Sequence, residues 1–277
     1  MLTFSAFADE IDADLDVQMD TCAANGVMAI DVRAIDNVNV SSMTLAQVKE
    51  YKKRLDDRGF EVPHIGSPIG KIRIGDDFDS HKDLVKHTCD VAHAFGTDRI
   101  RMFSFYPTEG ADIRDQRDEV IDQFSQMLEI AEAQDAVFYH ENEADIYGKT
   151  PEGVRDLFGT FNTPRLKGIF DPANFVTEHI KAYDEAWTGG LAEMTHALHI
   201  KDKVYDNGCV PAGQGDGQFP EIFADLARRE FSGYATLEPH LAAAGQFSGH
   251  TGPDLFATAV NALKKVCDEA GVAYKKA

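Results

Sequence analysis

Four residues able to bind a metal or move a proton stand at the ends of four apolar runs in the second half of the chain. Glu141 ends "AVFYHE", Asp171 ends "LKGIFD", His199 lies in "ALHIKD" and Glu238 lies in "YATLEPH". They are 30, 28 and 39 residues apart, about one strand-helix unit each time. If they converge on one point, the carboxylates repel one another unless a cation lies among them. The pattern therefore predicts that these four side chains hold one divalent metal ion.

The ligand types also indicate which metal the site would take. Oxygen-rich ligation with one histidine suits Mn²⁺ or Mg²⁺, with Co²⁺ or Zn²⁺ as the alternatives. Four protein ligands leave about two positions of an octahedron for substrate oxygens. The competing interpretation is that each residue is only a polar strand end. It has to explain why four of them fall in register on consecutive strands.

Those strand ends belong to an alternation of apolar runs and amphipathic segments that fills the chain. In the first three units the amphipathic segment ends at Gly26, Gly59 or Gly96, where a left-handed residue would stop a helix. Thr44 and Gln47 fit a capping box at the start of the second helix. Later helices are expected near 115–134, 151–159, 181–193, 219–230 and 253–270. The eight strand candidates are "LTFSAF", "VMAIDV", "FEVPHIG", "DRIRMFSFY", "AVFYHE", "LKGIFD", "ALHIKD" and "YATLEPH".

Eight strand-helix units in 277 residues predict an α/β protein with a parallel sheet and right-handed crossovers. Their number matches a single-domain (β/α)8 TIM barrel spanning residues 1–277 better than an open doubly wound sheet. No "GxGxxG" follows the first strand, which further weakens a dinucleotide-binding fold. In a barrel, active sites lie at the carboxyl ends of the strands, so the four side chains would share one rim.

The two-residue period of a strand predicts which side chains face the barrel interior. Leu198 and Ile200 suit the helix-facing side, which turns His199 and Lys201 inward. His140 is expected to point outward, away from the metal, and His196 to lie at the opposite end of the barrel. The remaining inward positions by this alternation are Arg101, Phe103, Glu141, Glu143, Ala197, Thr236, Glu238 and His240.

Composition narrows the partners and the compartment. A formal net charge of −20 and a sequence pI near 4.8 argue against nucleic acid and against an anionic membrane surface. The first residues, "MLTFSAFADEID", have no basic or long apolar region, and no run of 18 apolar residues occurs. The four cysteines have no CxxC spacing and are expected to be reduced. These features favour a cytoplasmic protein.

The segments "HEN", "FDPANF", "LHIKD" and "LEPH", with the loop "VPAGQGDGQFPEIFADLARREFSGYATLEPH", resemble the xylose isomerase-like TIM-barrel superfamily of sugar isomerases and epimerases. That superfamily includes ketose 3-epimerases, inosose dehydratase and endonuclease IV. The resemblance covers the whole chain. It implies that the same four residues bind one divalent metal, that the substrate is a small carbohydrate, and that the barrel associates into homo-oligomers.

The chain departs from the endonuclease IV pattern in two places. Such enzymes bind three zinc ions, with one histidine three residues after the aspartate of strand six and another in a DxH motif near strand seven. Here those features are Asn174 and "HIKDKVYD", with no following histidine. Together with the net charge, this argues against a DNA-repair phosphodiesterase. Ketose epimerases also tend to have a histidine at the position of Asn174, so substrate contacts there are expected to differ.

The expected chemistry is metal-assisted proton abstraction next to the carbonyl of a keto-sugar or cyclitol. Glu141 and Glu238, from strands on different sides of the metal, would remove and return the proton, giving an isomerase or epimerase. If a neighbouring β-substituent leaves instead, the site is a dehydratase or lyase acting on a keto-inositol or 3-keto-glycoside. A sugar-binding barrel without turnover and a metal-dependent phosphodiesterase are the less favoured alternatives.

Further side chains on the same rim are candidate substrate contacts. Arg101 is expected either to touch substrate or to pair with a carboxylate, and Lys201 either to bind a substrate oxygen or to neutralise Asp202. The segment "PHIGSPIGK" fits a tight turn better than a phosphate loop, while Asp9 and Glu10 are expected to cap the following helix and Trp187 to pack in the core. The predicted substrate-binding residues are His64, Lys71, Arg101, Asn174, Lys201 and His240.

Overall fold

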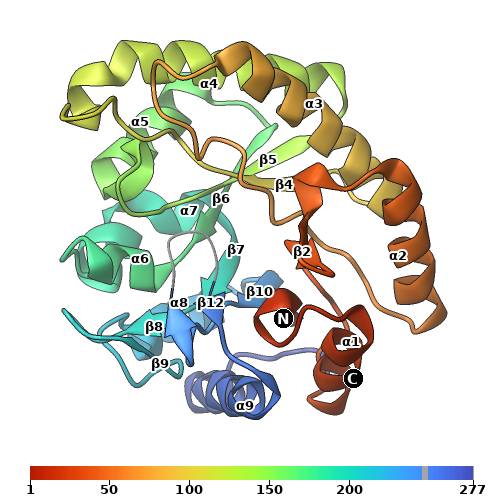
Figure 1. Ribbon diagram of the computed structural model, residues 1–277. Helices are drawn as coiled ribbons and strands as arrows, with labels where there is room; N and C mark the ends of the chain where they lie inside the picture. Colours follow the sequence, from red (N-terminus) through yellow and green to blue (C-terminus); the bar gives the residue numbers. More distant parts are fainter. Residues whose placement is uncertain (245–248, 277) are drawn as a thin grey trace.

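The computed structural model describes residues 1–244 and 249–276. At its centre is a parallel sheet with strand order β1-β10-β7-β6-β5-β4 (Figure 1). All neighbouring strands are parallel, as expected for strands joined by helical crossovers. The strands are β1 (Leu2–Ala6), β4 (Arg99–Met102), β5 (Val137–Glu141), β6 (Leu166–Phe170), β7 (Thr195–Ile200) and β10 (Gly233–Leu237).

Two irregular segments close this sheet into a barrel. Residues 27–32 bond to β1 through Asp31 N, which donates to Ala6 O at 3.0 Å. Residues 60–66 bond to β4 at Ile65, and the two segments meet at single bridges such as Val32 to Ile65. The second and third predicted strands are therefore wrong as continuous strands, although their positions in the barrel are right. Pro63 lies in the segment 60–66, the third predicted strand, and lacks the N–H donor that a continuous ladder needs.

Helices surround the sheet in chain order, so that the last returns beside the first (Figure 1). They are α1 (Leu15–Ala24), α2 (Leu45–Asp57), α3 (Phe78–Phe95), α4 (Arg117–Ala133), α5 (Pro151–Phe161), α6 (Pro172–Thr177), α7 (Ala192–Met194), α8 (Phe219–Arg228) and α9 (Pro253–Ala270). The helix expected at 181–193 is a π-helix over Ala182–Leu191 followed by α7, with Gly190 at φ 107° breaking its regular turn. Three short antiparallel pairs decorate the loops: β2 (Ala34–Ile35) with β3 (Val38–Asn39), β8 (Asp202–Lys203) with β9 (Cys209–Val210), and β11 (Ala243–Ala244) with β12 (Gly249–His250).

The predicted helix signals are confirmed where the structure tests them. Gly26, Gly59 and Gly96 have φ of 77°, 74° and 84°, the left-handed conformation that stops a helix. Thr44 and Gln47 form both bonds of the capping box at the start of α2. These stops orient each chain segment as it enters the next barrel strand.

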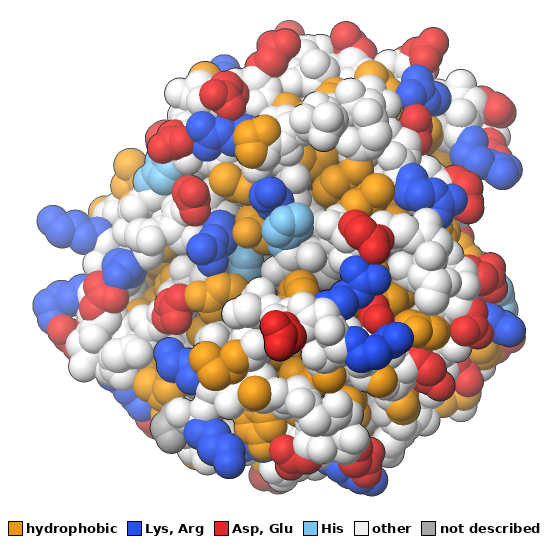
Figure 2. All heavy atoms as spheres, turned by 180° about the vertical axis from the view of Figure 1, so that it is seen from behind, with side chains coloured by type: hydrophobic (Ala, Val, Ile, Leu, Met, Phe, Trp, Pro, Cys, Tyr) orange, Lys and Arg blue, Asp and Glu red, His pale blue; other side chains and the backbone are white. Residues whose placement is uncertain are grey.

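The core lies between the sheet and the helices and is filled with large apolar side chains. Trp187 packs edge-on against Phe170, and its Nε1 donates to Asp225 Oδ2 at 2.6 Å, so its predicted packing role is confirmed. All four cysteines are free thiols, as predicted. Figure 2 shows acidic and basic side chains interspersed over the face turned away in Figure 1. No helix in the described part of the chain is long and apolar enough to cross a membrane.

Candidate metal centre

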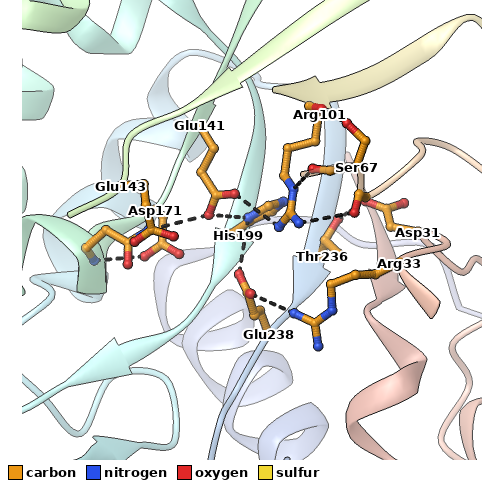
Figure 3. Close-up of polar contacts among 12 residues, drawn as sticks. Asp31, Arg33, Ser67, Arg101, Glu141, Glu143, Asp171, His199, Thr236 and Glu238 are labelled. Carbon is orange, nitrogen blue, oxygen red and sulfur yellow. Dashed lines mark hydrogen bonds and ion pairs between the residues drawn. The ribbon is translucent and has the colours of Figure 1, made fainter. Parts of the chain in front are cut away.

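The four predicted ligands come together at one end of the barrel. Glu141 ends β5, Asp171 follows β6, His199 lies in β7 and Glu238 follows β10. Each offers one ligand atom, and these atoms all lie within 4.8 Å of one another. The four residues are between 0% and 5% exposed. Figure 3 shows Glu141 and Glu238 approaching His199 from two directions.

Asp171 owes its orientation to the start of helix α6. Its Oδ1 caps the helix by accepting the N–H of Asn174 at 3.1 Å, with Pro172 at the first helical position. Its backbone is held on both sides by the amide of Asn142, which accepts from Asp171 N and donates to Asp171 O, each at 2.9 Å. The second carboxylate oxygen, Oδ2, is buried without a hydrogen bond, but it forms an ion pair with Lys201 Nζ at 2.9 Å. Asp171 thus lies close to the other three candidate ligands.

His199 presents Nδ1 to both glutamates. Its Nδ1 lies 2.8 Å from Glu141 Oε1 and 3.4 Å from Glu238 Oε2. Burial would lower the pKa of His199, but the two carboxylates outweigh it and raise the pKa to about 9. Burial would raise the pKa of Glu141, but His199 and Arg101 hold it at about 2. Without a metal, the imidazolium is therefore the cation between the two carboxylates.

Two arginines each hold one oxygen of one glutamate. Arg101 Nη1 lies 3.2 Å from Glu141 Oε2, and its other nitrogens donate to the carbonyls of residues 66 and 67. Arg33 Nη1 lies 3.0 Å from Glu238 Oε1. Both guanidinium carbons lie 4.7 Å from the centroid of the Phe7 ring. A side chain at Gly66 would collide with Phe7, since its Cβ would lie 2.6 Å from Phe7 Cε1.

Arg33 was missed by the sequence analysis. It directly follows the apolar run "VMAIDV", so the rule that polar residues at strand ends face the site could have found it. Of the two roles expected for Arg101, the structure gives it the pairing with a carboxylate.

Lys201 points to the four-residue cluster and not to Asp202. Its Nζ is 2.9 Å from Asp171 Oδ2 and 3.6 Å from Glu238 Oε2, so the expectation that it neutralises Asp202 is wrong. Burial raises the pKa of Asp171 to about 7, although Lys201 opposes that rise. Neighbouring residues of a strand point to opposite faces, which separates Lys201 from Asp202. Lys71, another predicted contact, pairs with Glu143 at 2.9 Å.

Asp9 and Glu10 lie in the short 3-10 helix η1 (Ala8–Glu10) and take part in the site's charge network, so the expectation that they cap the next helix is wrong. Asp14 is the residue that caps α1. Asp9 pairs with Arg33 at 2.8 Å. Glu10 is fully buried and lies 3.1 Å from Nε2 of His240. Sequence reasoning missed them because their partners, Arg33 and His240, lie 24 and 230 positions away in the chain.

His240 stands just outside the four-residue cluster. Its Nε2 lies 3.4 Å from Glu238 Oε1, and together with Glu10 the two residues form a second group close enough to share a cation. Arg33 already lies beside this group, 3.0 Å from Glu238 and 3.7 Å from Glu10. Its guanidinium supplies the positive charge that the two carboxylates require.

The remaining predicted residues divide between the site and the barrel wall. Asn174 donates to Glu141 Oε1 at 3.5 Å and so lies at the cluster. His64 lies deeper in the barrel, 3.1 Å from Asp31, with its ring against two tyrosines. His140 points toward the helices, as predicted, with Nε2 3.0 Å from Ser104 Oγ. His196 is exposed at the opposite end of β7.

The donor set fits a divalent cation. Three carboxylates and one imidazole are typical ligands of Mn²⁺, Mg²⁺ or Zn²⁺. Two of their oxygens, Asp171 Oδ2 and Glu238 Oε2, are buried and make no hydrogen bond, although Lys201 and His199 lie 2.9–3.6 Å from them. A divalent ion among the four side chains would compensate the charge of both carboxylates.

Comparisons with known proteins agree with the fold. Among solved structures, the chain is similar to the probable 3-DHS dehydratase AsbF involved in petrobactin synthesis from Bacillus anthracis, with 17% identity over 95% of this chain and 99% of that one and a TM-score of 0.75. It is similar to a D-tagatose 3-epimerase-like protein, with 15% identity over 98% of both chains and a TM-score of 0.78. It is also similar to the IOLI protein with a bound zinc atom, with 14% identity over 98% of both chains and a TM-score of 0.74.

Sequence comparison identifies the family. No curated protein sequence gives a match to the chain. The family described as xylose isomerase-like TIM barrel matches residues 19–266, which is most of the chain. With a closed parallel barrel around the site, the predicted fold class is confirmed, and the chain belongs to the xylose isomerase-like TIM-barrel family.

Proposed function

We propose that this protein is a divalent-metal-dependent enzyme that isomerises or epimerises a keto-sugar or cyclitol by moving a proton next to the carbonyl. The observation that carries the proposal is the convergence of Glu141, Asp171, His199 and Glu238, buried and within 4.8 Å of one another. The D-tagatose 3-epimerase-like protein and the zinc-containing IOLI protein among similar structures support it.

Glu141, Asp171, His199 and Glu238 would hold the metal. When bound there, a divalent ion would polarise a substrate carbonyl and make the neighbouring C–H more acidic. We propose Mn²⁺ or Mg²⁺ because three of the four ligands are carboxylates, with Zn²⁺ or Co²⁺ as alternatives.

The two glutamates are the proposed acid and base. They approach the site from strands that are separated by β6 and β7 in the sheet, so they reach it from different sides. Arg101 holds Oε2 of Glu141 and Arg33 holds Oε1 of Glu238, which leaves one oxygen of each turned toward His199. One carboxylate would take the proton from carbon and the other would return a proton to the opposite face.

Lys201 and Asn174 are the proposed contacts for substrate oxygens. Both are largely buried at the edge of the cluster, at 7% and 6% exposure. Lys201 Nζ can donate to a substrate oxygen that gains negative charge during proton removal, and this hydrogen bond would stabilise the transition state. For the other candidates we propose a positioning role: Arg101 orients Glu141, His240 orients Glu238 and Lys71 holds Glu143, because each lies beside that carboxylate. His64, enclosed in the barrel wall, is not proposed as a substrate contact.

Elimination is the second candidate reaction. It begins with the same proton removal and ends with loss of a β-hydroxyl or alkoxy group, so it uses the same residues. The probable 3-DHS dehydratase among the similar structures is the observation that favours it.

The test is solvent hydrogen exchange. Metal-loaded protein is incubated in D₂O with ketoses, inososes and 3-keto-glycosides, and each sugar is analysed by mass spectrometry and NMR. Isomerisation or epimerisation predicts deuterium at one carbon next to the carbonyl and a new stereoisomer or regioisomer. Elimination predicts loss of water or an alcohol.

The controls are the metal-free protein and the Glu238→Gln variant, which keeps the size of the side chain. Both should lose exchange while the variant remains folded. If the metal-loaded protein binds a sugar but exchanges no hydrogen, the barrel only binds sugar and the proposal is wrong. A metal content near three ions per chain would instead favour a phosphodiesterase.

A further inference from the structure

We propose that the substrate is uncharged: a free keto-sugar, keto-glycoside or cyclitol, without a phosphate or carboxylate group. This inference rests on the proposed function and narrows its substrate class. It comes from the way in which the charges and backbone N–H groups around the cluster are already paired. A buried anionic group on a substrate needs a cation or several donors that are not already engaged.

Among the residues that the structure describes, every lysine and arginine that touches the cluster has a carboxylate partner, and even Arg33 Nη2, which makes no hydrogen bond, lies 3.7 Å from Glu10. Lys201 pairs with Asp171 at 2.9 Å and Arg101 with Glu141 at 3.2 Å. The other two pairs are Arg33 with Asp9 at 2.8 Å and Lys71 with Glu143 at 2.9 Å.

The formal charge of this group is negative. Six carboxylates, of Asp9, Glu10, Glu141, Glu143, Asp171 and Glu238, surround the four cations, which leaves a charge of −2. A divalent ion brings the sum to zero. His240 adds one positive charge when it is protonated, and its Nε2 already lies between Glu10 and Glu238. A phosphate dianion would therefore enter a buried site with at most one surplus positive charge, which two carboxylates already hold.

The glycine-rich loop after β7 also offers no vacant anion site. In many barrels the loops after strands seven and eight bind phosphate through backbone N–H groups. Here Gly213, Gly215 and Gly217 donate their N–H groups to the carboxylate of Asp202, at 2.8, 2.9 and 3.0 Å. The chain's own carboxylate thus occupies the place where a phosphate would accept these bonds.

The close approach of the Asp202 carboxylate explains why two of these positions are glycine. A Cβ at Gly215 would lie 2.5 Å from Asp202 Oδ1, and a Cβ at Gly217 would lie 2.7 Å from the same atom. The loop is therefore built around an internal anion. Burial raises the pKa of Asp202, and the N–H groups oppose that rise by favouring the carboxylate.

The other glycine-containing loop, residues 66–71, is equally engaged. The N–H of Gly70 donates to Nε2 of His81 at 3.0 Å, and the N–H of Lys71 donates to Pro68 O at 2.9 Å. A Cβ at Gly70 would lie 2.1 Å from Phe103 O, so this glycine serves close packing. The turn interpretation of "PHIGSPIGK" is therefore the one that the structure supports.

The experiment compares matched neutral and anionic probes on the Mg²⁺-loaded protein by isothermal titration calorimetry and deuterium exchange. The pairs are D-fructose with D-fructose 6-phosphate, D-tagatose with D-tagatose 6-phosphate, and 2-keto-myo-inositol with 3-dehydroshikimate. We expect the neutral member of at least one pair to bind at least tenfold more tightly and to exchange faster. An anionic member that binds as tightly or exchanges as fast overturns the inference, while its exchange still supports the proposed function.

Inorganic phosphate gives a test that needs no sugar. We expect no binding heat and no rise in Tm for the metal-loaded protein at millimolar phosphate. Binding of phosphate at micromolar concentration, or failure of every neutral probe to bind, overturns the inference.

The Glu143→Gln variant tests the charge argument directly. It removes the carboxylate beside Lys71, so the affinity for the phosphorylated member of a pair should rise several-fold relative to the neutral member. Glu109→Gln removes the same charge from an exposed position and should leave that ratio unchanged. An unchanged ratio in Glu143→Gln contradicts the pairing on which the inference depends.

Discussion

Replacing Arg101 with methionine tests whether Glu141 needs a buried cation partner. The Arg101 side chain is 7% exposed and that of Glu141 is 1% exposed, and their atoms are 3.2 Å apart. Methionine keeps much of the length of the side chain but removes the guanidinium, which lies over Phe7. Breaking a buried ion pair on one side typically costs about 3–5 kcal/mol, and Glu141 would then depend on His199, 2.8 Å away, for its compensating charge.

That cost can be converted into a melting temperature. With an unfolding entropy of about 2.1 cal/mol/K per residue, this chain of 277 residues loses about 0.6 kcal/mol of stability per degree near Tm. The metal-free variant should therefore melt about 5–9 °C below the metal-free wild type. Differential scanning calorimetry measures this shift directly.

The metal supplies the decisive comparison. A divalent ion would give Glu141 a new cationic partner, so saturating Mg²⁺ or Mn²⁺ should raise the Tm of the Arg101→Met variant more than that of the wild type. Arg117→Met removes a surface arginine that pairs with Asp156, and it should change neither Tm nor the metal effect to a comparable extent. If Arg101→Met melts like the wild type, or if metal stabilises both equally, the charge balance described for Glu141 is wrong.

Four further substitutions test the site and the structure around it. Glu141→Gln and Glu238→Gln should each lower the exchange rate of a substrate by about 10²–10⁴-fold, measured by deuterium incorporation; wild-type rates would remove both from the chemistry. Asp202→Ala leaves four backbone N–H groups without their acceptor and should lower the free energy of unfolding by about 2 kcal/mol or more. Amide hydrogen exchange should become faster only in residues 203–217, and unchanged protection there would contradict the anchoring role of Asp202. Burial lowers the pKa of His140 to about 4. As the pH drops from 6.5 to 4, this histidine becomes protonated in the unfolded chain before it does in the folded protein, so the free energy of unfolding falls. The loss is about 3 kcal/mol for this residue. His140→Gln should flatten the dependence of Tm on pH in that window, and an equal slope in both proteins would refute the assignment.

The convergence of the four candidate ligands was predictable because strand ends follow simple geometry. Strands of a parallel barrel finish on the same rim, and alternate residues face the interior. Those two rules select Glu141 over His140 in "AVFYHEN", and the structure places His140 against Ser104 on the helix side. The rules needed no information about distant contacts.

The charge network around the ligands could not be predicted in the same way. Arg33 and Glu238 are 205 positions apart in the chain and meet only when the barrel closes. Glu10 and His240 are 230 positions apart. Nothing in the local sequence around Asp9 and Glu10 distinguishes an ion-pair partner from a helix cap.

Strand geometry also predicts that Lys201 does not pair with Asp202. Lys201 and Asp202 are neighbours at the end of β7, where successive side chains point to opposite faces. Asp202 therefore faces the glycine-rich loop while Lys201 faces Asp171. The broken strands at 27–32 and 60–66 are different, because Pro63 shows where a ladder weakens but not how the chain bends around it.

The proposed metal site is tested most directly by anomalous X-ray diffraction from crystals of the Mn²⁺-loaded protein. If Glu141, Asp171, His199 and Glu238 hold one divalent ion, we expect one anomalous peak per chain, at about 2.0–2.4 Å from one atom of each of these four side chains. A structure with no peak at this position, with the ion bound elsewhere, or with three ions clustered in the barrel would contradict the proposed site.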